Sequence, residues 1–87
     1  MEPLMSLSQL PVGGSARVKK LLSTGSMRRR LQDIGLIEGT WVRCLQKSPA
    51  GDPVAYEIRG AVIALRSDDS SQILVQPPME ESGQSVR

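Results

Sequence analysis

The chain has no histidine and no phenylalanine, and its 87 residues include one cysteine, one tryptophan and one tyrosine. The absence of histidine removes the commonest general base and the commonest metal ligand, and it excludes Ser-His-Asp and Cys-His catalytic arrangements. Cys44 has no second cysteine for a disulfide. One thiol and scattered carboxylates form neither a tetrahedral zinc set nor a calcium loop. We therefore expect no catalytic residues, no metal ligands and no cofactor.

The sequence also lacks a long hydrophobic run. No stretch approaches the ~20 apolar residues that cross a bilayer, and Met1 to Leu10 has neither the basic start nor the apolar run of a signal peptide. Together with the single cysteine, this favours a soluble domain of the reducing cytoplasm, with no direct membrane insertion. If the protein serves a membrane, we expect it to dock onto a protein already there.

Charge is unevenly distributed along the chain. Residues 1–47 hold eight Lys and Arg against three Asp and Glu, whereas residues 48–87 hold three against six. The region from Ser15 to Gln32 has no acid and six basic side chains: Arg17, Lys19, Lys20, Arg28, Arg29 and Arg30. Such a cluster suits an electrostatically complementary partner, although a solvated basic face is its commoner origin.

The residue pattern predicts a mainly β domain. Five short segments show the alternation or apolar content of strands with one buried face: 15–22, 41–46, 54–59, 61–66 and 73–75. The turn-rich connections favour a small barrel, because closing the sheet removes exposed edges. We expect Leu4–Leu10 to be a lead-in and Ser67–Ser71 to be a polar turn. We place one domain at 1–78 and a disordered tail at 79–87.

One short helix is expected over about 26–35, between the first and second strands. Met27, Leu31 and Ile34 fall on one helical stripe that can plug the core. Thr24 or Ser26 can cap its start, and Gly35 suits the left-handed residue that ends a helix.

Four segments resemble motifs of the FeoA family, ferrous iron transport protein A. Arg30–Val42 (RLQDIGLIEGTWV) is similar to its RLxxLGLxxGxxV signature, and Leu7–Gly13 to its LxxLxxG motif. Pro49–Pro53 (PAGDP) is similar to the PxGDP loop, and Arg59–Arg66 (RGAVIALR) to the RGxxxALR strand pair. The four segments span roughly residues 4–76 in family order. The chain departs from the family at Ser67–Ser71, where members often have an acidic residue and alanine, so no contact is carried over there.

The resemblance implies an SH3-like barrel and a non-catalytic cytosolic accessory protein of bacterial ferrous iron uptake. Its implied partner is the cytoplasmic GTPase part of the membrane transporter FeoB, which would hold it peripherally at the inner membrane. The same fold occurs as the C-terminal domain of iron-dependent repressors, so a regulatory module of that kind is an alternative. The family pattern prescribes no metal ligands.

The residues of the signature have a structural explanation, since they permit turns or pack in the core: Leu31, Gly35, Leu36, Gly39 and Val42. The interface candidates are exposed residues of types enriched in binding hot spots, together with one neighbouring leucine: Arg28, Arg29, Arg30, Trp41 and Leu45. Trp41 and Leu45 are predicted to share a strand face, although Trp41 could instead be half-buried against the helix.

The sequence suggests two other kinds of partner. A small barrel that binds nucleic acid is favoured by the basic cluster but lacks aromatic residues for base stacking, so no nucleic acid is expected. Self-association through an exposed strand edge stays open.

Overall fold

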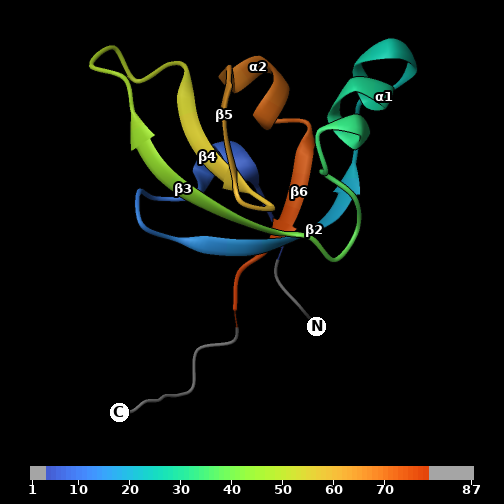
Figure 1. Ribbon diagram of the computed structural model, residues 1–87, viewed down its shortest axis with the longest axis horizontal. Helices are drawn as coiled ribbons and strands as arrows, with labels where there is room; N and C mark the ends of the chain where they lie inside the picture. Colours follow the sequence, from blue (N-terminus) through green and yellow to red (C-terminus); the bar gives the residue numbers. More distant parts are fainter. Residues whose placement is uncertain (1–3, 79–87) are drawn as a thin grey trace.

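The computed structural model of the protein describes residues 4–78 (Figure 1). The strands are β1 (Met5–Ser6), β2 (Ser15–Leu21), β3 (Trp41–Lys47), β4 (Val54–Ile58), β5 (Ala61–Leu65) and β6 (Ile73–Gln76). The helices are a 3-10 turn η1 (Leu7–Gln9), α1 (Gly25–Asp33) and α2 (Ser67–Ser70). The mainly β class and the helix between the strands at 15–21 and 41–47 are confirmed. The predicted tail at 79–87 lies outside the described residues.

The six strands form one antiparallel sheet in the order β1-β6-β2-β3-β4-β5. The sheet curves strongly, and α1 lies at its side away from the β3–β4 hairpin loop (Figure 1). In the described part of the chain β1 and β5 are the two edges of the sheet. The closed sheet expected from the sequence is therefore open between these two strands.

Two expectations were wrong. Residues 4–10 are more than the short lead-in expected: Met5 pairs with Val75 of β6, and Leu7 and Leu10 are buried in the core. The sheet therefore has six strands instead of about five. Ser67–Ser71 is not a simple turn, since α2 makes one helical turn there and buries Ser70.

The core follows the predicted alternation. Val54, Tyr56 and Ile58 are buried along β4, as are Val42 and Cys44 along β3. The Tyr56 hydroxyl donates a hydrogen bond of 3.4 Å to the carbonyl oxygen of Leu7. This bond gives the one buried phenol a partner and ties the N-terminal segment to the sheet.

Helix α1 ends in a Schellman motif. The Leu36 N–H donates to the Leu31 carbonyl and the Gly35 N–H to the Gln32 carbonyl, both at 3.0 Å. Gly35 has a φ of 107° and Leu36 is buried, as predicted. At the other end Thr24 occupies the N-cap position without a side-chain hydrogen bond. Leu31 is buried, whereas Met27 and Ile34 are partly buried against the core.

Candidate partner-binding surface

The outer face of β2, β3 and β4 gathers large polar and aromatic side chains. Each strand buries alternate residues, so the intervening ones point outward. Cross-strand pairing sets Arg17 beside Trp41, and Arg43 beside Glu57. Arg59 follows β4 in the turn to β5. We call this set, Arg17, Trp41, Arg43 and Glu57, the Trp41 face.

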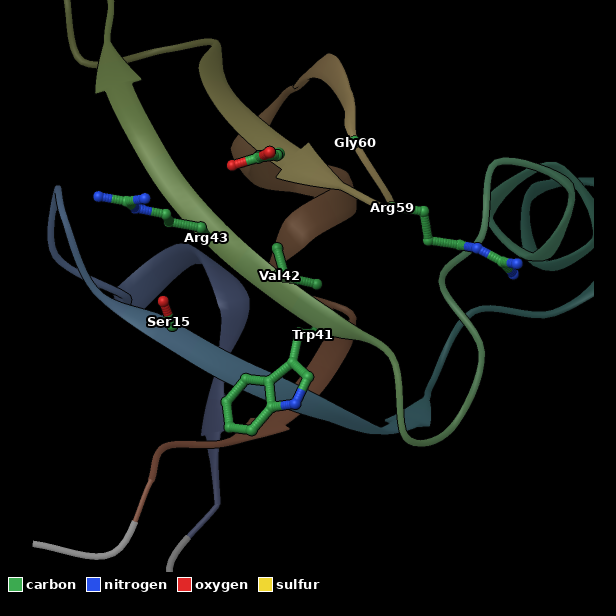
Figure 2. A pocket seen from close by; sticks show the side chains of 7 residues that line it. Ser15, Trp41, Val42, Arg43, Arg59 and Gly60 are labelled. Atoms are coloured by element: carbon green, nitrogen blue, oxygen red, sulfur yellow. The ribbon is translucent and has the colours of Figure 1, made fainter.

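Trp41 is the central aromatic group of this face. Its side chain is 47% exposed, and the guanidinium carbon of Arg17 lies 4.8 Å from the ring centroid. This is the geometry of a cation–π contact. The ring therefore lies against Arg17 of β2 (Figure 2). It does not lie against α1, which was the alternative expected from the sequence.

A shallow groove of about 310 Å³ lies beside the ring. Its walls include Trp41, Arg43, Glu57 and Arg59 (Figure 2). The Trp41 face thus carries two guanidinium groups and one carboxylate near a half-exposed indole, whereas the Arg59 side chain extends from the groove toward the end of α1 (Figure 2). Such a surface can bind an acidic protein surface that offers an apolar contact for the ring.

The three helix arginines are exposed but do not line this groove. Arg28 donates a 3.1 Å hydrogen bond to the carbonyl oxygen of Leu21, so it helps join α1 to the end of β2. Arg30 lines a second groove, between α1 and β5. The predicted interface residues therefore do not form one surface: the arginines of α1 lie away from the groove beside Trp41.

Leu45 also lies away from the groove. It is partly buried and occupies a break in the register of β3 with β4, between Cys44 and Gln46. A bulge of this kind interrupts the alternation on which a shared face with Trp41 was predicted. Its role in binding stays a prediction.

Sequence reasoning did not select Arg17, Arg43, Glu57 or Arg59. The signal for the first two was present, since both occupy outward positions of predicted strands. Arg43 follows Trp41 by two residues on the same strand, whereas the strand order that sets Arg17 beside Trp41 is not visible in a single sequence.

Two titratable groups of residues 4–78, Cys44 and Tyr56, are buried in the core. Burial raises the pKa of the Cys44 thiol above its ordinary value of 9.0, although Lys47 partly opposes the shift. Burial also raises the pKa of the Tyr56 phenol above 10.0. Cys44 is therefore a protonated core residue at neutral pH and not an activated nucleophile.

Between residues 4 and 78 no group of three or more Cys, Asp or Glu side chains is placed to hold a metal ion. In the same part of the chain no helix is long and apolar enough to cross a bilayer.

Comparison with known proteins matches the FeoA domain to residues 5–77. A curated relative, the Fe(2+) transport protein A/Fe(2+) transporter FeoB fusion protein of Porphyromonas gingivalis, is 32% identical over 72 residues. The match covers 83% of this chain and 8% of the fusion protein, so the chain spans a small part of that relative.

Two solved structures are similar over most of the chain. The FeoA protein of Chlorobium tepidum superposes with a TM-score of 0.83 at 31% identity, covering 90% of this chain and 74% of that one. The zinc complex of FeoA from Stenotrophomonas maltophilia, described as a prokaryotic SH3 domain protein, gives a TM-score of 0.74 at 31% identity, covering 82% and 88%. The fold is thus SH3-like, as predicted.

Proposed function

Because the chain belongs to the FeoA family, we propose that it is a non-catalytic accessory protein of ferrous iron uptake that binds the cytoplasmic GTPase part of a FeoB-type transporter. The observation that carries this proposal is the Porphyromonas gingivalis relative, which joins the two proteins in one chain. Fusion makes the encounter of two modules intramolecular and raises their effective concentration. The proposed contact needs a binding surface on this domain, and its place is the cytoplasm, at the inner membrane through its partner.

The Trp41 face is the surface best suited to that contact. Tryptophan and arginine are enriched among residues that dominate binding energy. Arg17 already restrains the indole ring, so little side-chain entropy is lost when a partner covers it. Arg17 and Arg43 add positive charge that steers an acidic surface toward this face.

Calorimetry of the purified chain with the FeoB GTPase domain of the same cell tests this function, with and without nucleotide. We expect saturable binding, weakened about tenfold or more in Trp41→Ala, as for a hot-spot residue. Ile37→Ala is the matched control, because Ile37 is similarly exposed but lies off the Trp41 face. Absence of saturable binding contradicts the proposed partner, whereas unchanged binding in Trp41→Ala contradicts only the surface.

Nucleic acid is the less favoured partner. The Arg17 guanidinium lies over the ring of Trp41, and stacking platforms need free aromatic faces. Salt-sensitive binding to single-stranded DNA without binding to the GTPase domain would reverse this preference. Binding of a small effector in place of either would favour the regulatory-module alternative.

A further inference from the structure

β5 presents a free backbone edge. It pairs with β4 through a two-residue turn, Arg59 and Gly60, whose φ angles of 52° and 86° fit a type I′ hairpin. In such a hairpin the residues that flank the turn, Ile58 and Ala61, are the first hydrogen-bonded pair, and bonded and non-bonded pairs then alternate.

This alternation leaves the N–H and C=O groups of Val62 and Ala64 pointing away from β4. Within residues 4–78 neither residue takes part in a backbone hydrogen bond outside the hairpin, and Val62 is 68% exposed. From Ala61 to Leu65 the strand has no charged residue and no proline. Charges and prolines are the usual devices that stop an edge strand from pairing.

A groove of about 400 Å³ runs between this strand and α1. Its apolar lining includes Met27, Ile34 and Ile63, and its charged lining comprises Arg30, Arg66 and Asp69. We call it the β5 groove. A strand added to β5 would hydrogen-bond to the free edge and place alternate side chains against the apolar lining.

The charges around β5 indicate which kind of chain the β5 groove can bind. Arg59 and Arg66 are exposed at the two ends of the strand, and Arg30 lies across the groove. A second copy of β5, paired in either direction, sets arginine beside arginine at both ends, and like charges on neighbouring strands are destabilising. Asp69 is the one acid that lines the groove. An acidic chain is therefore the complementary partner.

We propose that the β5 groove binds an extended segment of a partner protein, with an apolar centre and acidic residues at both ends, as an added strand on β5. Of the charges used here, this site shares only Arg59 with the groove beside Trp41, and it uses backbone hydrogen bonds as well as charge. The inference goes beyond the proposed function and does not depend on FeoB as the partner.

The probe is a synthetic peptide with an alternating valine–threonine centre and glutamates at both ends, followed by fluorescence anisotropy at low salt. The same peptide with lysine ends is expected to bind at least about tenfold more weakly, because it is repelled by the flanking arginines. In amide-exchange NMR the Val62 and Ala64 amides are expected to exchange fast in the free protein and to be protected by the glutamate peptide. Equal binding of the two peptides, or no binding by either, overturns the proposal.

Two pairs of variants separate backbone and charge. Ala64→Pro removes the outward N–H and leaves the pairing with β4, so we expect at least about a tenfold loss of peptide binding, whereas Ala64→Ser keeps the N–H and the affinity. Arg30→Glu is expected to weaken binding, with Arg29→Glu as control for the same change in charge on the same helix. If Ala64→Pro does not fold, the comparison of Arg30→Glu with Arg29→Glu still tests the proposal, and equal peptide binding by these two variants contradicts it.

Trp41→Ala separates the two sites, because it is expected to leave peptide binding unchanged. A concentration-dependent dimer of the free chain that Ala64→Pro abolishes would assign β5 to a second copy and overturn the acidic segment.

Discussion

Two constraints, backbone conformation and space, favour glycine at position 35. Its φ of 107° is a conformation that L side chains rarely adopt. A Cβ at this position would also lie 2.9 Å from Cδ of Arg59 and 3.3 Å from Cγ2 of Ile58. We predict that Gly35→Ala lowers the free energy of unfolding by about 1–3 kcal/mol, measured by urea denaturation.

Gly39 is the matched control for this prediction. Its φ is 94°, but nothing lies within 4 Å of a Cβ there, so Gly39→Ala carries the backbone strain alone. The difference between the two variants then measures the crowding by Ile58 and Arg59. Adding Arg59→Ala should recover part of that difference. Equal costs at the two glycines would show that Arg59 simply moves aside.

The buried side chains of Cys44 and Tyr56 make the free energy of unfolding sensitive to pH in the alkaline range. Burial raises both pKa values in the folded protein, so the unfolded chain loses these protons first. The contribution of each buried group to the free energy of unfolding is complete below its pKa in the unfolded chain, which is about 9 for the thiol and about 10 for the phenol. As pH rises above that value, the contribution falls by at most about 1.4 kcal/mol per pH unit for each group. We predict falling unfolding free energies above pH 9, measured by urea denaturation.

Cys44→Ala is the control for this pH dependence. The variant should remove the part of the slope that begins near pH 9 and keep the part that begins near pH 10. A free energy of unfolding that does not fall between pH 8 and 11 contradicts the buried, protonated state of both groups.

Leu31 is the one fully buried side chain of helix α1. Leu31 is 2% exposed, whereas Met27 on the same stripe is only partly buried. We predict that Leu31→Ala costs about 2–5 kcal/mol of unfolding free energy, through lost burial and the cavity left behind. Met27→Ala should cost less. A thermal midpoint unchanged by Leu31→Ala would show that the helix does not rest on the core through this stripe.

The arginines of α1 differ in what they do for the fold. Arg28 bonds the Leu21 carbonyl, while Arg29, beside it, is exposed and makes no such contact among the described residues. We predict that Arg28→Glu lowers the unfolding free energy by about 0.5–1.5 kcal/mol, the net value of one hydrogen bond. Arg29→Glu should change it by less than about 0.5 kcal/mol. Chemical denaturation of both variants measures the difference, and equal values would remove the structural role of Arg28.

The elements that the sequence predicts best are those with a sustained pattern. The alternation along β2, β3 and β4 and the stripe of α1 fixed their type and, within one or two residues, their bounds. β1 was missed because two residues, Met5 and Ser6, are too short to alternate. α2 was missed because its one turn consists of serine and aspartate, which favour turns as much as helix starts.

At the scale of the whole molecule, the surface was harder to predict than the fold. Trp41 was selected because of its residue type, but its neighbour Arg17 comes from the pairing of β2 with β3. Arg43 follows Trp41 by two residues on β3, so the alternation of that strand already placed it on the same face. The helix arginines are contiguous in the sequence, which made them the conspicuous candidates. The fold instead directs Arg28 to β2 and Arg30 to the β5 groove. The closeness of these arginines in the sequence thus indicated one basic site, whereas the structure places them in separate surroundings.

These separate basic groups are expected to affect the kinetics of the proposed contact with the FeoB GTPase domain differently. Arg43 lies within the Trp41 face, whereas Arg29 lies on α1 outside it. If the Trp41 face is the contact, Arg43→Glu should slow association and flatten its dependence on salt, because steering charges act mainly on the association rate. Trp41→Ala should instead speed dissociation, since packed anchors act on the lifetime of the complex.

Surface plasmon resonance at several ionic strengths measures both rates, with Arg29→Glu as the control of equal charge change. We predict that Arg29→Glu slows association less than Arg43→Glu, because its charge lies farther from the groove and is screened over about 8–10 Å at physiological salt. The reverse order would place the contact on α1, where the run of arginines in the sequence first suggested it.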